Sequence, residues 1–161
     1  MRNPRCLTCP VRGHCEAAAA GVQERIPLPR KAKPTPLFRR YVLCIRDGRG
    51  RVLIEQRPSK GRWGGLWQFR TIDSPGGDGT YCDATLRAWL GFAVSEPVKL
   101  GHVKHALTHR RYAFDAYVAE LTDKLRPAEQ TWVTLAGLDR YPMSKPQLAI
   151  AGMLRRHAGG D

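Results

Sequence analysis

Residues 38–72 read FRRYVLCIRDGRGRVLIEQRPSKGRWGGLWQFRTI, and this stretch decides the fold. Its apolar centres favour β-strands, and the run Asp47-Gly48-Arg49-Gly50 is typical of a tight hairpin turn. The strands and loop expected around that turn are, in chain order, a strand over 38–46, a return strand over 51–57, a loop over 58–65 and a third strand over 66–72. The stretch therefore predicts the beginning of a β-sheet.

The rest of the chain adds both helices and strands to this sheet. We first expect a glycine-rich loop at Pro75–Gly79 and a helix at Asp83–Leu90 ended by Gly91. Two strands follow, at Val98–His105 and Arg111–Leu121, joined by a loop at Ala106–Arg110. A short strand at Trp132–Leu135 and a closing helix at Ser144–His157 complete the domain. Ser144 is the expected N-cap of that closing helix. Its expected core-facing residues are Leu148, Ile150, Ala151 and Leu154. Intermingled strands and helices predict an α+β class, a mixed α/β sandwich.

Two segments precede this domain, which we place at 38–158. Residues 1–21 are rich in cysteine and end in an alanine run, Ala17–Ala20, that favours a short helix stopped by Gly21. Residues 22–37 hold four prolines and four basic residues, which favours an extended basic linker. The chain is therefore expected to have a cysteine-rich loop, a linker and one folded domain.

The charge is strongly positive, with a net formal charge of +13 over 161 residues. Such an excess favours polyanionic partners, because each neutralised phosphate releases condensed counterions. The plainer alternative is a generally arginine-rich protein. No apolar run is long enough to predict a transmembrane helix, and the N-terminus does not resemble a signal peptide. We expect a reducing compartment, where cysteines bind metals or pack in cores more often than they form disulfides.

Three cysteines are spaced like metal ligands. Cys6, Cys9 and Cys15 form a Cys-x2-Cys-x5-Cys pattern, in which one loop can wrap a metal and a third thiolate can close another face. A zinc site or a four-iron cluster normally needs four ligands, and His14 is one candidate for the fourth ligand of a zinc ion. Cys44 and Cys82 are expected to be structural thiols.

The order of several motifs resembles the C-terminal part of A/G-specific adenine DNA glycosylases. The matching stretches are residues 3–15 with the basic linker, 52–58, 61–69, 102–111 and 132–142, with departures at Gln68 and Arg70, where the family usually carries Glu and Pro. The resemblance implies a Nudix-like domain with a mixed sheet and flanking helices. It also implies a 4Fe-4S loop of the form Cys-x6-Cys-x2-Cys-x5-Cys. Three of its four cysteines match Cys6, Cys9 and Cys15, and the first would fall just before residue 1.

The family removes adenine paired with 8-oxoguanine in base-excision repair, and its catalytic carboxylate lies in an N-terminal helical domain that these residues do not include. The resemblance therefore implies a chain that binds and does not cut. Its expected partners are duplex DNA containing 8-oxoguanine and the N-terminal glycosylase domain, with a monomer in the cytoplasm, at the nucleoid, and no membrane association.

The resemblance also implies particular contacts with DNA. Leu107, Thr108 and His109 match a Phe-Ser-His loop that touches the lesion, and Arg110 follows them. A hydroxyl at Thr108 can accept from N7–H of 8-oxoguanine, whereas N7 of guanine is itself an acceptor. His109 can pair with a phosphate or base edge, and Leu107 can press against bases. The linker cations expected to contact phosphates are Arg30, Lys31 and Lys33.

Two other functions remain as alternatives. A Nudix nucleoside diphosphate hydrolase needs Gly-x5-Glu-x7-Arg-Glu-x2-Glu-Glu-x-Gly, whose carboxylates hold Mg²⁺. No glutamate occurs between Glu55 and Glu96, although Arg87 is present, so this activity is not expected. The other alternative is a small metal-binding interaction module, which one bound zinc would favour over four irons. Trp63 and Trp67 are expected to be structural anchors more than base-stacking residues.

Overall fold

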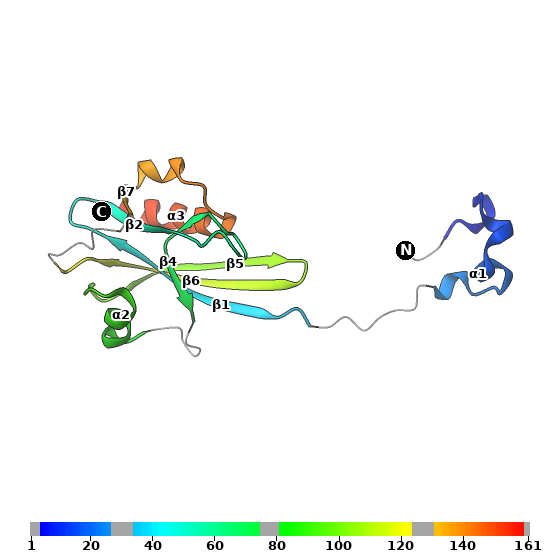
Figure 1. The fold of residues 1–161 in the computed structure, drawn as a ribbon, viewed down its shortest axis with the longest axis horizontal. Helices are drawn as coiled ribbons and strands as arrows, with labels where there is room; N and C mark the ends of the chain where they lie inside the picture. The colour runs from blue at the N-terminus through cyan, green and yellow to red at the C-terminus, as the bar shows by residue number, and fades with distance from the viewer. Residues whose placement is uncertain (1–3, 27–33, 75–80, 124–130, 160–161) are drawn as a thin grey trace. The chain divides into compact units, whose positions relative to one another are not determined.

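The computed structural model describes residues 4–26, 34–74, 81–123 and 131–159 (Figure 1). The chain divides into two compact units, Met1–Pro34 and Thr35–Asp161, which are described separately. The expected phosphate contacts Arg30, Lys31 and Lys33 and the expected loop Pro75–Gly79 lie outside the described residues. Within the described part of the chain, no helix combines the length and the apolar character needed to cross a membrane.

The first unit consists of short helical turns. They are η1 at Cys6–Thr8, η2 at Arg12–His14, α1 at Glu16–Ala19 and η3 at Gln23–Arg25. The alanine run forms α1, one residue earlier than expected, because alanine has the most favourable helix propensity. Gly21 follows with φ of 64°, a left-handed conformation that ends the helical path at little steric cost.

The described residues of the second unit form a seven-stranded mixed sheet. Its strands are β1 at Leu37–Arg46, β2 at Arg51–Gln56, β3 at Trp67–Gln68, β4 at Arg70–Asp73, β5 at Val98–Leu107, β6 at Arg110–Glu120 and β7 at Thr131–Thr134. The main strand order is β3-β2-β1-β6-β5, with β4 paired to β1 and β7 paired to β2. Strands β1 and β6 are parallel, and the other named pairs are antiparallel. This arrangement confirms the predicted α+β class with a mixed sheet.

Helices cover both faces of the sheet, α2 at Asp83–Leu90 and α3 at Lys145–Ala158, with η4 at Ala136–Arg140 before α3 (Figure 1). Successive side chains of a strand point to opposite faces, so β1 supplies both cores. Val42 and Cys44 pack in a cluster with α3, whereas Leu43 and its alternating neighbours pack in a second cluster with α2. Both faces of β1 are buried, which explains why its centre is apolar without interruption. Burial raises the pKa of the Cys44 thiol, as suits a core residue.

The expected third strand over 66–72 is in fact two strands. β3 pairs with β2, whereas β4 pairs with β1, and the chain changes partner at Phe69. The Phe69 side chain is fully buried, and its backbone N–H donates to Gln147 Oε1 at 3.2 Å. Long-range pairing therefore splits a stretch whose residue types all favour one strand.

The two helices largely follow the expectations. α2 has the predicted bounds and ends at Gly91, whose φ of 78° closes the C-terminus. α3 begins after Ser144, but the Ser144 side chain makes no capping hydrogen bond. Leu148 is 50% exposed, so its expected place in the core is wrong. It lies off the stripe of Gln147, Ile150, Ala151 and Leu154 that α3 buries.

Cys82 also differs from expectation. It is exposed and precedes α2 as its N-cap residue, so it is not a core thiol. Its Sγ lies 3.1 Å from Thr85 Oγ1, and this hydrogen bond lowers the pKa of the thiol.

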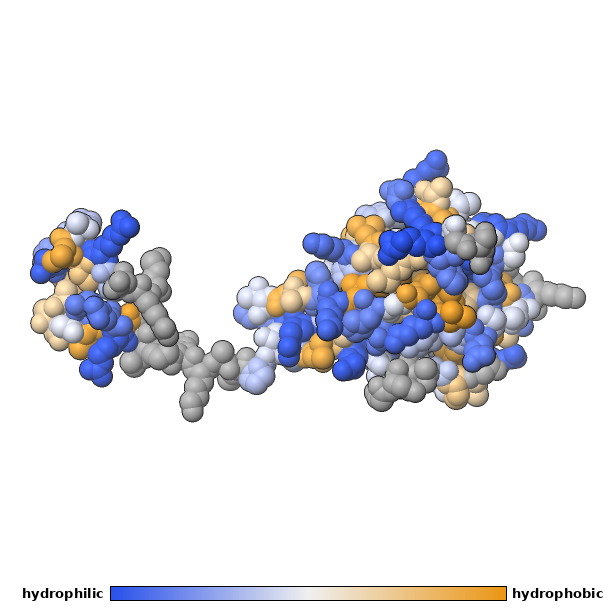
Figure 2. Space-filling view, turned by 180° about the vertical axis from the view of Figure 1, so that it is seen from behind, coloured by the Kyte–Doolittle hydropathy of each residue, from blue (hydrophilic) through white to orange (hydrophobic). Residues whose placement is uncertain are grey.

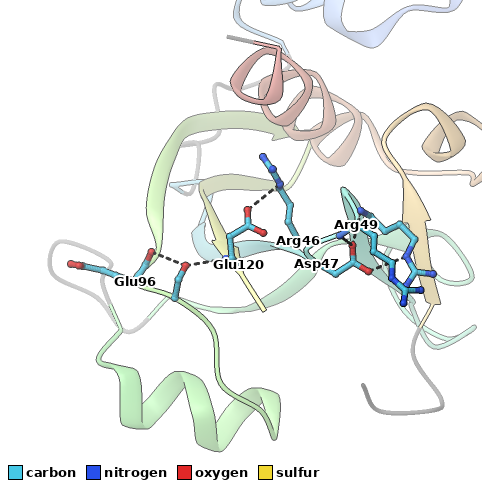
Figure 3. Close-up of polar contacts among 7 residues, drawn as sticks. Arg46, Asp47, Arg49, Glu96 and Glu120 are labelled. Atoms are coloured by element: carbon cyan, nitrogen blue, oxygen red, sulfur yellow. Dashed lines mark hydrogen bonds and ion pairs between the residues drawn. The ribbon is translucent and has the colours of Figure 1, made fainter. Parts of the chain in front are cut away.

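The hairpin turn between β1 and β2 is organised by Asp47 (Figure 3). Asp47 is 2% exposed. Its carboxylate accepts hydrogen bonds from the backbone N–H groups of Arg49 and Arg51 and from Nε of Arg51, each at 2.9 Å. Burial raises the pKa of this carboxyl, but these hydrogen bonds outweigh burial and lower it overall. Beside the turn, Arg46 Nε pairs with Glu120 Oε1 at 3.1 Å, which joins the ends of the parallel strands.

Candidate nucleic-acid interface

The predicted recognition residues lie at the end of a long hairpin formed by β5 and β6. Leu107 and Arg110 are paired across the two strands, so Thr108 and His109 alone form the turn. The expected loop over Ala106–Arg110 is therefore too long, because Ala106 pairs with Arg111 within the ladder. Figure 1 shows the hairpin end of β5 and β6, and the neighbouring start of β1, running past both α2 and α3.

The side chains at the turn are accessible. Thr108, His109 and Arg110 are exposed, so a duplex can reach the hydroxyl, imidazole and guanidinium groups. Leu107 is half-buried and packs against the core cluster on the α3 side of the sheet. Its side chain is therefore only partly available to a base.

A row of aromatic rings supports one face of the hairpin. The Arg110 guanidinium lies 5.3 Å from the centre of the Phe38 ring, and Phe38 stacks on Tyr112 with centroids 5.5 Å apart. Trp63 packs on the same row, with its ring 5.0 Å from Tyr112 and 6.0 Å from His105. These spacings lie in the range of favourable aromatic contacts. The row holds Arg110 and the strand ends in place beneath the exposed turn.

The loop between β2 and β3 places Trp63 against this row of aromatic rings. Trp63 is the one non-glycine residue with positive φ among the described residues, at 56°. Its neighbour Gly64 lies against the backbone carbonyl of Ser59, where a Cβ would clash. Trp67 contacts Tyr141 edge to face at 4.9 Å. Both tryptophans are therefore structural anchors, as expected.

The opposite face of the hairpin carries a groove that the sequence reading did not identify. We call it the basic groove, a cavity of about 740 Å³ whose basic wall residues are Arg39, Lys99, Lys104 and Arg111, with His102, His105 and Asp115 also in its lining. The alternating polar residues at 102 and 104 of β5 are visible in the sequence and indicate that one face of this strand is polar. The contribution of Arg39, more than sixty residues earlier in the chain, depends on the parallel pairing of β1 with β6.

The three expected cluster ligands lie in the first unit. Cys6, Cys9 and Cys15 are partly exposed, and no group of three or more Cys, His, Asp or Glu side chains within the described ranges is placed to hold a metal ion. Thiolates are the right donors for an iron–sulfur cluster, but three thiols are one fewer than a 4Fe-4S cluster takes from a site of four cysteines. These three thiols alone therefore do not complete such a site, and among the described residues His14 is not grouped with them.

The helix expected to carry metal ligands in a hydrolase is α2. Its described side chains, from Ala84 to Leu90, include no carboxylate. Leu86 and Leu90 are buried against the sheet, and Trp89 lies beneath the Arg70 guanidinium at 5.4 Å. This stretch of α2 therefore packs against the sheet and offers no carboxylate to Mg²⁺.

A polar network occupies the nearby ends of β2, β3 and β4. Glu55 accepts from Gln68 Nε2 at 2.8 Å and pairs with Arg70, while Gln68 Oε1 accepts from Arg57 Nη1 at 2.7 Å. Gln68 is only 8% exposed, and its hydrogen bonds satisfy it. The two departures from the family pattern, Gln68 and Arg70, thus take part in one structural network.

Comparison with known families and structures agrees with this fold. The model of the NUDIX domain family matches residues 41–152, well over half of the chain. The C-terminal domain of mouse MUTYH, solved in complex with human PCNA, is similar with a TM-score of 0.60 and 18% identity, over 75% of this chain and 89% of that domain.

Hydrolases of the same fold are similar to a comparable degree. The MutT protein from Methanosarcina mazei Go1 has a TM-score of 0.59 and 15% identity, over 79% of this chain and 99% of that protein. The Nudix hydrolase RenU from M. smegmatis has a TM-score of 0.54 and 20% identity, over 76% and 87%. At these identities the similarity concerns the fold, and the choice between binding and hydrolysis depends on the site residues.

Proposed function

This chain belongs to the NUDIX domain family, and from that premise we propose that it is the C-terminal part of an A/G-specific adenine DNA glycosylase. In this role it binds duplex DNA and recognises 8-oxoguanine opposite adenine, while another domain cleaves the N-glycosidic bond. The proposed setting is DNA repair in the cytoplasm, at the nucleoid.

One observation carries the proposal: the chain presents polar groups on an exposed hairpin, whereas the described side chains of its α2 helix offer no carboxylate to a metal ion. Thr108 and His109 are exposed at the tip, and Arg110 beside them is held over Phe38. A NUDIX hydrolase needs several carboxylates around Mg²⁺ ions, and the segment from Ala84 to Leu90 supplies none. Recognition without hydrolysis is therefore the better reading of this site.

The chemistry of the tip suits an oxidised guanine. 8-Oxoguanine carries a hydrogen on N7 and an oxygen on C8, whereas N7 of guanine is a bare acceptor. The Thr108 hydroxyl can accept from N7–H or donate to the C8 oxygen, because a hydroxyl does both. His109 and Arg110 can donate to a phosphate or to a base edge. A single hydrogen bond of this kind contributes about 0.5–1.5 kcal/mol, or roughly 2- to 10-fold in affinity.

The test compares duplexes with 8-oxoguanine opposite adenine and with guanine opposite adenine. We expect the chain to bind the lesion duplex more tightly, and Thr108→Ala with His109→Ala to lower that preference more than it lowers total affinity. Thr108→Ser keeps the hydroxyl and is the matched control, which should retain the preference. Equal affinity of the unaltered chain for both duplexes would remove the proposal. An unchanged preference in the double variant would show that another surface reads the lesion.

A further inference from the structure

The α2 side of the sheet is left open beside the hairpin. On this side Tyr41 and Tyr117 pack under α2, next to Leu86 and Leu90. Nearer the hairpin the same side carries Arg39 and the other walls of the basic groove, and Figure 1 shows these strand ends running past α2. The sheet is therefore longer than the helix that covers it, and the uncovered part carries the basic residues of the groove.

The strand register determines the shape of the basic groove. Ala113 of β6 pairs with Arg39 of β1 on one side and with Lys104 of β5 on the other. Neighbouring strands are about 4.8 Å apart, so the two basic residues stand roughly 10 Å apart across a small side chain. Ala113 is 4% exposed and lines the cavity between them. Two basic walls and an alanine floor make a channel for a narrow, extended anion.

Among the described residues, the four cations of the basic groove have no carboxylate partner of their own. Arg39, Lys99, Lys104 and Arg111 are exposed, and none of them pairs with a carboxylate in the described part of the chain. Arg111 donates from Nε and Nη2 to the Thr35 carbonyl at 3.3 and 3.1 Å, which steadies its guanidinium and leaves other N–H groups for a ligand.

The one acidic residue of the groove is already occupied. Asp115 is 9% exposed, and its Oδ1 lies 2.8 Å from Nδ1 of His102. The pair orients the His102 ring and turns the carboxylate charge toward it. Four cations thus face one engaged carboxylate, and like charges gathered on adjacent strands repel one another unless an anion lies between them.

We propose that the basic groove binds the phosphate backbone of a DNA duplex, alongside the lesion that the hairpin tip contacts. This inference rests on the proposed function and adds a second surface to it. Ala106 immediately precedes Leu107, and Arg111 immediately follows Arg110, so the groove continues into the tip along the same two strands. Cations that neutralise phosphates supply affinity without sequence preference, whereas the tip supplies discrimination.

The experiment measures how duplex affinity depends on salt. The groove variant is Arg39→Ala with Lys104→Ala and Arg111→Ala. The matched control is Arg49→Ala with Arg140→Ala and Lys145→Ala, which removes the same charge from exposed residues outside the groove. Circular dichroism checks that each variant is folded. Because Arg111 also bonds to Thr35, a second variant, Arg39→Gln with Lys104→Gln, leaves that contact intact.

Each phosphate contact contributes about 0.9 to the slope of log affinity against log salt. We expect the groove variant to lower the slope by roughly 3, so that between 50 and 200 mM salt the unaltered chain loses about 40-fold more affinity than the variant. The Gln variant should lower the slope by roughly 2. The control should keep the original slope, and the lesion preference of the groove variant should fall less than that of the hairpin variant.

The possible failures are distinguishable. Equal slopes for the groove variant and the control would overturn the groove while leaving lesion preference, and thus the proposed function, intact. A chain that binds no duplex at any salt concentration would overturn both. A chain that binds duplex with a groove-dependent slope but without lesion preference would keep the groove and remove the proposed reading of the lesion.

Discussion

Replacing Trp63 should reveal how strongly the aromatic row supports the recognition hairpin. Trp63 is half-buried, with ring centroids 5.0 Å from Tyr112, 6.0 Å from His105 and 6.2 Å from Phe114. A fully buried tryptophan costs about 3–5 kcal/mol when truncated to alanine. Because this ring is only half-buried, we expect Trp63→Ala to lower the free energy of unfolding by about 2–3 kcal/mol.

The backbone at this position permits a sharper comparison. Trp63 has φ of 56°, a conformation that costs a non-glycine residue about 1–2 kcal/mol. Glycine adopts it freely, although it loses more entropy on folding. We therefore expect Trp63→Gly to be as stable as Trp63→Ala or up to about 1 kcal/mol more stable, the reverse of the usual order. Trp63→Phe keeps a ring against Tyr112 and should cost only about 1 kcal/mol.

Urea unfolding followed by circular dichroism measures all three variants, since it does not depend on the fluorescence of the residue being replaced. An alanine variant within about 0.5 kcal/mol of the unaltered chain would refute the claim that Trp63 supports the hairpin. A glycine variant clearly less stable than the alanine variant would refute the left-handed backbone at this residue.

Two further substitutions test the framework. Gly64→Ala should cost about 2–3 kcal/mol in urea unfolding, because its Cβ would meet the Ser59 carbonyl, whereas Gly48→Ala has open space and should cost far less. Asp47→Asn should lower stability by about 1–2 kcal/mol at pH 7, because the Arg51 guanidinium loses its charged partner. The folded-state pKa of Asp47 is depressed, so its contribution is present above about pH 4 and disappears as the pH falls through the folded-state value. A pH-independent difference between Asp47→Asn and the unaltered chain would contradict this.

The surface of the second unit mixes hydrophilic and apolar side chains. Figure 2 shows apolar side chains in patches among hydrophilic ones on the face seen from behind. Among the described residues of this unit, the exposed large apolar side chains belong to three different elements, and they are Leu37, Val98 and Leu148. Leu37 lines the basic groove, whereas Val98 and Leu148 lie outside it.

Local patterns predicted the elements whose residues make their contacts nearby. The Asp47 turn and α2 with its Gly91 end were predictable because turn residues, helix propensity and glycine caps act within a few residues. The accessible Thr108 and His109 also came from a short match, although the turn proved shorter than its expected loop. Motif order further indicated the NUDIX fold that the family match confirms.

Pairing between strands distant in the chain decided the rest of the fold and of the site. Whether residues 66–72 form one strand or two depended on the separate partners β2 and β1, and no local preference records that choice. The basic groove likewise exists only because a parallel pairing sets Arg39 beside Ala113, opposite Lys104. Sequence alone determined which segments could fold, and that no glutamate lies between Glu55 and Glu96, where the pattern of a NUDIX hydrolase needs several. The tertiary structure decided which cations lie together, because the register of two strands depends on contacts between residues far apart in the chain.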